Sequence, residues 1–221
     1  YSIANKKFKF QFKKKRLSGK LIIPNENAYK KLKSKIKNSY LTLGINNENM
    51  SFVFELTKLL KIKKQSFLMS LNSFRGLPHR YEIFLKRKNC TFVNDSKATS
   101  FQATKFALKK KNNIFWIVGG LPKKNDKIIL NTLKKNIVKA YLIGKNINFF
   151  KKQLNNQLNY YVSKNLRNSI NQIFKDLKIN KRKNNTVLLS PASASYDQFS
   201  NFEQRGEEFK KLCKQYAKKY T

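Results

Sequence analysis

The sequence has few acidic residues, cysteines and histidines. It carries 11 Asp and Glu against 49 Lys and Arg, which gives a net charge of +38. Its two cysteines, Cys90 and Cys213, are too few for a disulfide framework or a cysteine-based zinc site. They fit a reducing compartment, so we expect a cytoplasmic protein. The only histidine is His79, and a lone histidine in a turn is more often structural than catalytic.

Two further absences exclude classes of function. No apolar run approaches the roughly 20 residues of a membrane helix, and no signal peptide is visible, so we expect no membrane insertion. The phosphate loop Gly-x-x-x-x-Gly-Lys-Ser/Thr is also missing, because the Gly-Lys pairs at 19–20 and 144–145 lack the upstream glycine and the following hydroxyl. The chain opens with Tyr1 inside a strand-like pattern, and we expect it to be a fragment.

What is present is a hydrophobic fraction of 40%, with 13% aromatic residues, which is enough to build a core. The lysines are spread along the whole chain, and no basic-aromatic motif, zinc knuckle or basic tail marks a docking element. We therefore interpret most of the charge as solvated surface and expect no nucleic-acid partner. A basic nucleic-acid-binding α/β module is the alternative from another class, and it would require lysines clustered on one face.

The first part of the chain predicts short strands and several helices. Alternating phenylalanines predict a half-buried strand at 8–12, and a second strand is expected at 21–23. A lysine-rich surface helix is expected between 26 and 37, and apolar spacing predicts helices from 46 to 60 and from 64 to 74. Gly and Pro at 76–80 then break the pattern, so we divide the chain into domains 1–77 and 78–221.

The second part alternates between apolar strands and helices, which predicts an α/β fold with a mostly parallel sheet flanked by helices. Helices are expected at 99–109, 128–136, 147–154, 166–177 and 203–219. Strands are expected at 81–85, 90–94, 113–118, 139–143, 160–163 and 186–189. Polar segments follow the strands that end near 94, 118 and 189. Because ligands bind such sheets at the carboxyl ends of the strands, we expect these segments to converge on one edge.

Three stretches of the sequence carry recognisable motifs. Residues 188–209 read Leu-Leu-Ser-Pro-Ala-x-Ala-Ser-x-Asp-Gln-Phe-x-Asn-Phe-Glu-Gln-Arg-Gly-x-Glu-Phe, residues 94–99 read Asn-Asp-Ser-Lys-Ala-Thr, and residues 76–80 read Gly-Leu-Pro-His-Arg. Together they resemble the C-terminal part of the Mur ligase family, most strongly from about Met50 onward. The resemblance implies a Rossmann-like C-terminal domain, preceded by a remnant of the central ATPase domain.

The resemblance also implies an activity. Within the family, the motifs are most similar to those of ligases that add D-glutamate to UDP-N-acetylmuramoyl-L-alanine in peptidoglycan precursor synthesis, through an acyl phosphate. ATP and Mg²⁺ would be required. The phosphate loop and the magnesium ligands would lie upstream, so we expect no metal ligands in this chain, no activity of the chain alone, and a monomer. Other Mur-type ligases, a folylpolyglutamate synthetase relative and a non-catalytic relative remain alternatives.

Site residues follow from the matched motifs. The resemblance implies that Asn46, Asn49, Arg80 and Asp95 contact the nucleotide, although Ile45 stands where the family has histidine and the asparagines could simply cap a helix. It implies that Lys97 and Lys123 stabilise charge during catalysis and also bind D-glutamate, although Lys124 could compete with Lys123. The implied D-glutamate site comprises Lys97, Thr99, Lys123, Ser195, Phe202 and Tyr196, the last where the family often has leucine.

Overall fold

A computed structural model describes residues 1–38, 41–42, 44–87 and 89–219, with the backbone alone at Ile45 and Lys219. The described chain divides into two compact units, Tyr1–Gly76 and Leu77–Thr221. None of the helices within these described ranges is both long and apolar enough to cross a membrane.

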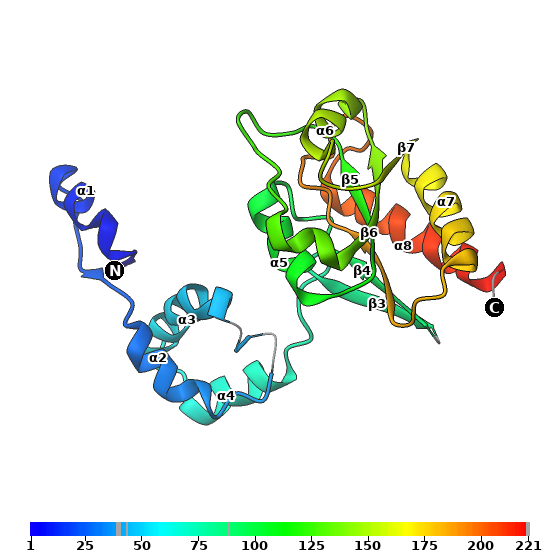
Figure 1. The fold of residues 1–221 in the computed structure, drawn as a ribbon. Coiled ribbons are helices and arrows are strands. Elements are labelled where there is room, and N and C mark those ends of the chain that lie inside the picture. The colour runs from blue at the N-terminus through cyan, green and yellow to red at the C-terminus, as the bar shows by residue number, and fades with distance from the viewer. Residues whose placement is uncertain (39–40, 43, 88, 220–221) are drawn as a thin grey trace. The chain divides into compact units, whose positions relative to one another are not determined.

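The Tyr1–Gly76 unit consists mainly of helices (Figure 1). Strands β1 (Ser2–Ile3) and β2 (Leu21–Ile22) form a short parallel pair. The remaining elements are the 3-10 helices Lys6–Phe8 and Gly44–Asn46 and the α-helices α1 (Lys9–Lys14), α2 (Glu26–Lys33), α3 (Asn47–Leu59) and α4 (Lys64–Ser73). The last three helices and the segment that follows α2 share one apolar cluster, made of Tyr29, Leu32, Ile36, Leu41, Met50, Phe67 and Leu71.

The strand predicted at 8–12 is wrong, because these residues form the end of a 3-10 helix and most of α1. The Asn5 side chain accepts a hydrogen bond from the Lys7 N–H and starts the helical turn. A strand is stabilised by pairing with a neighbour, and no strand in the described chain pairs with this segment. Phe10 is accordingly 73% exposed. The alternating phenylalanines therefore do not mark the buried face of a strand.

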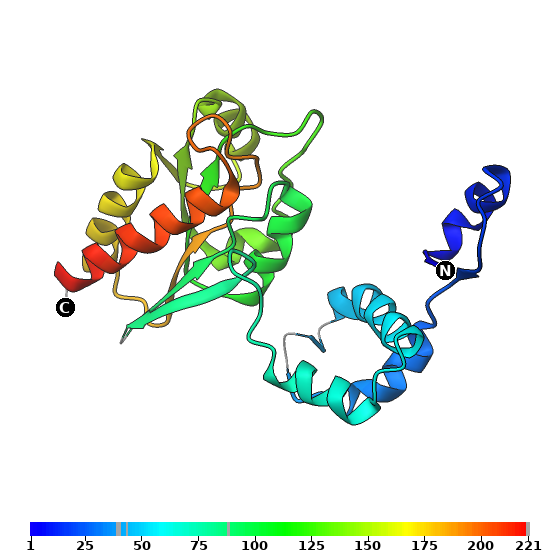
Figure 2. The same cartoon turned by 180° about the vertical axis from the view of Figure 1, so that it is seen from behind.

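The Leu77–Thr221 unit contains, within its described residues, a six-stranded sheet of order β3-β4-β8-β5-β6-β7 (Figures 1 and 2). Strands β3 and β4 are antiparallel and the other neighbours are parallel, as the alternation of strands and helices predicts. The strands are β3 (Glu82–Arg87), β4 (Cys90–Asn94), β5 (Ile114–Gly119), β6 (Ile137–Ile143), β7 (Tyr160–Lys164) and β8 (Asn185–Leu189).

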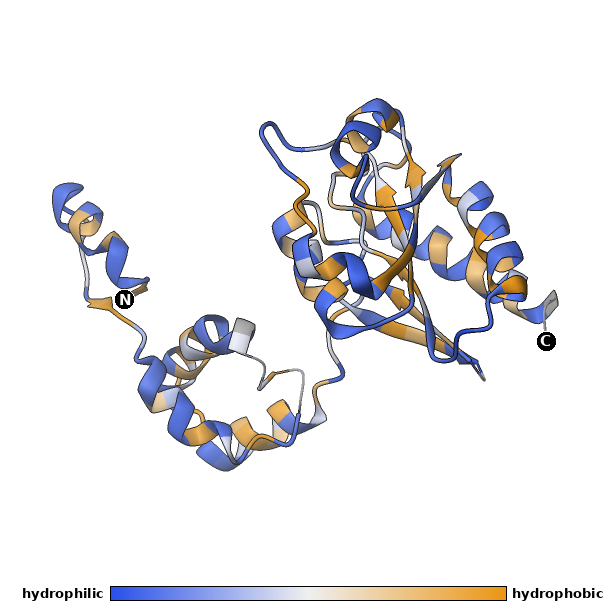
Figure 3. Cartoon of the chain, in the orientation of Figure 1, coloured by the Kyte–Doolittle hydropathy of each residue, from blue (hydrophilic) through white to orange (hydrophobic). Residues whose placement is uncertain are grey.

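Helices cover both faces of this sheet. The helices α5 (Phe101–Lys110) and α6 (Ile147–Leu154) lie on one face, and α7 (Leu166–Ile179) and α8 (Phe202–Lys219) lie on the other (Figures 1 and 2). Strand β5 shows why: alternate side chains point to opposite faces, so Trp116 joins one cluster and Phe115 the other. Both are buried, and the central strands carry much of the orange, hydrophobic colour in Figure 3.

The helix predicted at 128–136 is also wrong over its first three residues. Only Asn131–Asn136 is helical, and it is a 3-10 helix. The backbone N–H groups of the preceding residues bond to glutamine side chains in and just after α6. Ile128 N–H donates to Gln153 Oε1 at 3.0 Å, and Leu130 N–H donates to Gln157 Oε1 at 3.1 Å. These bonds replace the ones a helix would make, and the two adjacent β-branched isoleucines favour the extended form.

Candidate functional site

Three loops meet at the carboxyl edge of the sheet: the β4 loop (residues 95–100), the β5 loop (residues 120–130) and the β8 loop (residues 190–201). They follow neighbouring parallel strands, since β8 lies between β4 and β5. Backbone bonds then join the β5 and β8 loops. Leu121 N–H donates to Ala194 O and Ala194 N–H to Leu121 O, both at 2.9 Å, while Gly119 N–H donates to Pro191 O at 3.0 Å.

Gly120 permits this crossing of the β5 and β8 loops. Its φ angle is 130°, a conformation that residues with a side chain rarely adopt. A Cβ at this position would collide with Ala194 O and lie 2.8 Å from Ser193 Oγ. Glycine at position 120 therefore has a structural reason, because the two loops touch there.

The β5 loop is also tied to the end of the β4 loop. Asp126 Oδ2 accepts the Phe101 N–H at 2.9 Å, at the start of α5. Asp126 N–H in turn donates to Lys123 O at 3.1 Å. The turn that carries Lys123 is thereby bonded to the segment that follows Thr99. Sequence reasoning gave Asp126 no role, although a carboxylate beside a helix N-terminus is a recognisable pattern.

Arg205 of α8 connects the β4 and β8 loops through its guanidinium group. The sequence alone gave this residue no role. This side chain of α8 is 1% exposed. Its Nε donates to Ser96 Oγ at 3.0 Å, and its Nη2 donates to Ser96 O at 2.8 Å and to Ser193 O at 3.1 Å. Three charge-assisted bonds from one planar group fix both loops to the start of the helix.

The Arg205 guanidinium keeps its charge although it is buried. Burial lowers its pKa to about 10, against an opposing effect from the nearby charge of Asp197. Its Nη1 is buried without a hydrogen-bond partner among the described residues, on the side facing Gly120. An arginine in a helix is easily interpreted from sequence as a surface residue, so its burial was not foreseeable from spacing alone.

Asp95 braces the start of the β4 loop. It is 8% exposed, and its carboxylate accepts the Tyr81 N–H at 3.0 Å and the Ser190 hydroxyl at 2.7 Å. Burial raises the pKa of Asp95 to about 6, although the bonds from Ser190 and Tyr81 and the charge of Arg80 act in the opposite direction. Arg80 itself is exposed. A carboxylate has about four acceptor positions, so two remain for a further donor.

Lys97, Phe202 and His79 form a compact group at the other end of the β4 loop. Lys97 Nζ lies 3.6 Å from the centroid of the Phe202 ring. The His79 ring packs edge-on against the same ring, with centroids 5.9 Å apart. Lys97 N–H donates to His79 O at 3.0 Å. His79 is 6% exposed, so it lies behind the loops rather than on the surface.

The other expected site residues occupy varied environments. Ser195 is buried in the β8 loop, Thr99 is half-buried and Lys123 is exposed. Tyr196 is 72% exposed, so its ring is directed largely into solvent.

Asn46 and Asn49 belong to the Tyr1–Gly76 unit, immediately before α3 and in its first turn. They lie in a different unit from the three loops, and the side chain of Ile45 lies outside the described part of the chain.

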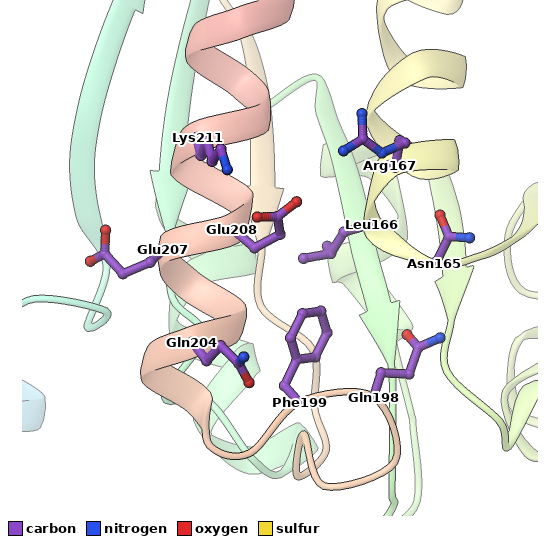
Figure 4. A pocket seen from close by; sticks show the side chains of 9 residues that line it. All are labelled: Asn165, Leu166, Arg167, Gln198, Phe199, Gln204, Glu207, Glu208 and Lys211. Carbon is purple, nitrogen blue, oxygen red and sulfur yellow. The ribbon is translucent and has the colours of Figure 1, made fainter.

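A cavity with a volume of about 610 Å³ lies between the beginnings of α7 and α8 (Figure 4). Figure 4 shows Arg167, Glu208 and Lys211 around its mouth, with Phe199 below them. None of the residues expected to bind nucleotide or D-glutamate lines it. In the described ranges, no three His, Cys, Asp or Glu side chains gather in a way that could hold a metal ion.

The chain is similar to curated bacterial ligases. It is 37% identical over 181 residues to the UDP-N-acetylmuramoylalanine–D-glutamate ligase of Wolbachia sp. subsp. Brugia malayi (strain TRS), covering 82% of this chain and 36% of that protein. It is 34% identical over 176 residues to the ligase of the same name from Rickettsia felis, covering 80% and 39%. The chain thus spans little more than a third of the length of these relatives. No protein-family model matches it.

Solved structures show the same fold. The MurF ligase from Thermotoga maritima in complex with ADP matches with a TM-score of 0.53 and 17% identity, covering 80% of this chain and 40% of that one. The folylpolyglutamate synthetase from Helicobacter pylori matches with a TM-score of 0.50 and 18% identity, covering 86% and 49%. At these identities the likeness concerns the fold alone.

Proposed function

Because this chain belongs to the Mur ligase family, we propose that it supplies the amino-acid-binding part of an ATP-dependent ligase that adds D-glutamate to UDP-N-acetylmuramoyl-L-alanine. The observation that supports this most directly is the convergence of the β4, β5 and β8 loops, held together by the Leu121–Ala194 bridge and by Arg205. Convergence matters because a small dicarboxylate must be held by several groups at once.

The amino-acid site is assigned to groups on these loops. Lys97 and Lys123 supply the positive charge that two carboxylates require, and charge-assisted bonds of this kind are among the strongest in proteins. Thr99 and Ser195 supply hydroxyl donors. The backbone at Phe202 lies at the first turn of α8, where the helix dipole favours an anion. These groups orient the amine of D-glutamate toward the activated carboxylate of the other substrate.

The nucleotide is assigned to Arg80 and Asp95, with Asn46 and Asn49 on the adenine side. Arg80 is exposed and suits phosphate oxygens, and the Asp95 carboxylate retains acceptor positions for ribose hydroxyls. ATP, when bound with Mg²⁺, supplies the phosphoryl group that activates the substrate carboxylate. In this proposal residues 1–77 are the end of the central ATP-binding domain and residues 78–221 the amino-acid-binding domain of a monomeric, cytoplasmic enzyme.

Substitution of Lys123 tests the amino-acid site. In the full-length protein, Lys123→Ala should raise the KM for D-glutamate by roughly tenfold or more, because a hydrogen bond to a charged group contributes about 1.5–3 kcal/mol. Lys124→Ala is the matched control, since this lysine is adjacent and equally exposed. Phosphate release at varied D-glutamate gives both values. An unchanged KM in Lys123→Ala, or a larger effect in Lys124→Ala, would remove the assignment.

A second candidate is a ligase that adds another amino acid, since a folylpolyglutamate synthetase shares this fold. Competition among D-glutamate, L-alanine, diaminopimelate and lysine in the phosphate-release assay separates the two. Preferential use of D-glutamate supports the first proposal, and preference for any of the others supports the second.

A further inference from the structure

The cation of Lys97 is held by an aromatic ring. Its Nζ lies 3.6 Å from the centroid of Phe202, at the start of α8. None of the ion pairs among the described residues includes Lys97. Lys210, two turns further along the same helix, is different, because its Nζ lies 3.2 Å from Glu82 Oε1 and 2.7 Å from Glu207 Oε1.

Phe202 is itself held at two points, its backbone and its ring. Ser96 Oγ donates to Phe202 O at 2.8 Å, and this serine is held in turn by Arg205. The edge of the His79 ring packs against Phe202 at an interplanar angle of 79°. Phe202 is thus held by a hydrogen bond at its backbone and by a contact with His79 at its ring.

The position of His79 is also determined by its partners. Asn94 Nδ2 lies 2.9 Å from His79 Nδ1 and donates to Glu82 Oε2 at 3.0 Å, while Asn94 Oδ1 accepts the Ser96 N–H. These partners orient the Asn94 amide so that His79 Nδ1 is the acceptor. The same histidine accepts the Lys97 N–H at its carbonyl oxygen. One residue thus positions both the backbone of Lys97 and the ring beneath its ammonium.

We propose that Phe202 is a positioning residue that holds the Lys97 ammonium at the site by a cation–π contact without neutralising it. The inference rests on the proposed function. A ring quadrupole attracts a cation and stabilises its location, but it carries no net charge. A carboxylate partner would hold the ammonium equally well and cancel its charge, and the incoming dicarboxylate would have to displace it. The ring leaves the full charge of Lys97 available to the substrate.

Substitution within the full-length protein tests this role. Phe202→Leu removes the quadrupole and keeps an apolar side chain, and it should raise the KM for D-glutamate by about threefold to tenfold, with a smaller effect on kcat and none on the KM for ATP. Phe202→Tyr keeps an aromatic face, so this variant should retain most of the wild-type affinity for D-glutamate. Replacement by 3,4,5-trifluorophenylalanine, which keeps the shape and weakens the quadrupole, should resemble leucine.

Two controls separate this role from a general effect on folding. Phe84→Leu removes a ring of β3, outside the three loops, on which no described lysine rests, and it should leave the KM for D-glutamate unchanged. Thermal unfolding followed by Trp116 fluorescence shows whether each variant is folded. If Leu, Tyr and trifluorophenylalanine variants share one KM, the inference is overturned.

An observation independent of turnover distinguishes failure of the inference from failure of the proposed function. The ε-methylene protons of Lys97 should show an upfield ring-current shift in the NMR spectrum of the wild type and of Phe202→Tyr, and lose it in Phe202→Leu. If the wild type releases no phosphate in response to D-glutamate, the proposed function fails. Absence of the shift in the wild type overturns the contact itself.

Discussion

The two units of the chain bury their side chains to very different extents. In the Leu77–Thr221 unit, large side chains such as Trp116 and Phe150 are completely buried against the two faces of a sheet. In the Tyr1–Gly76 unit, one small cluster lies among α2, α3 and α4, and Phe10 is 73% exposed. The difference shows where loops can be held in place, because each of the three converging loops extends from a strand whose carboxyl end is buried.

The largest expected difference between the units concerns two phenylalanines. Phe150→Ala should destabilise the Leu77–Thr221 unit by about 3–5 kcal/mol, because the ring is 0% exposed and its loss leaves a cavity. Phe10→Ala should change the unfolding free energy by less than about 0.5 kcal/mol, as expected for an exposed side chain. Urea unfolding measures both, with Trp116 fluorescence reporting on the second unit, since it is the only tryptophan in the chain.

Either of two results would contradict the comparison. A loss of less than about 1 kcal/mol in Phe150→Ala would mean that the core around α6 is loosely packed. A large loss in Phe10→Ala would mean that this ring is covered in solution. The matched residue type removes differences in side-chain chemistry from the comparison.

A second prediction concerns the buried acid at the site edge, which has no counterpart among the resolved pKa shifts of the first unit. The folded-state pKa of Asp95 is raised to about 6, above its ordinary value of 3.8, so the folded state binds a proton more tightly than the unfolded state. This contribution to stability is present below about pH 4 and is lost as the pH rises to about 6. The loss amounts to about 3 kcal/mol.

Asp95→Asn isolates this contribution from the other titrating groups. The amide oxygen can still accept the Tyr81 N–H, so the variant should fold. Between pH 4 and 7 the wild type should lose about 3 kcal/mol relative to Asp95→Asn. Only this difference is diagnostic, because Glu82 and Asp176, whose folded pKa values are lowered, shift stability in the opposite direction in both proteins. If the unfolding free energies of wild type and variant changed in parallel with pH, the pKa of Asp95 would not be raised by folding, and the prediction would be wrong.

These contrasts also explain which features the sequence predicts. The parallel sheet is predictable because strand β5 and the last three residues of β8 are apolar runs followed by polar motifs. The segments at 8–12 and 128–136 were mispredicted because their outcome depends on partners elsewhere in the chain: a missing neighbouring strand in one case and the amides of Gln153 and Gln157 in the other.

The site divides in the same way. The motifs located the three loops, because these carry the polar residues that interrupt the apolar pattern. The sequence assigned no role to Arg205 and Asp126, which fix the loops, because their partners are distant in sequence: Ser96 lies 109 positions from Arg205, and Phe101 lies 25 positions from Asp126. Spacing along a chain cannot report contacts of this kind.

The smallest expected effect compares helix caps, where the units should behave alike. Asn165 caps α7 by accepting the Asn168 N–H at 2.9 Å, and Asn25 caps α2 by accepting the N–H groups of Asn27 and Ala28 at 3.0 and 3.2 Å. Each substitution by alanine should cost about 1 kcal/mol, because a cap bond depends on local geometry and not on the depth of the core.

The probe separates the two caps. Asn165→Ala should shift the urea transition seen by Trp116 fluorescence, since α7 packs in the same unit as that tryptophan. Asn25→Ala should leave that transition in place and alter only the helical signal in circular dichroism. Asn25→Ala could instead move the fluorescence transition by the full 1 kcal/mol expected of a lost cap. That result would mean that the two units unfold together, as one cooperative unit, despite their different extents of burial.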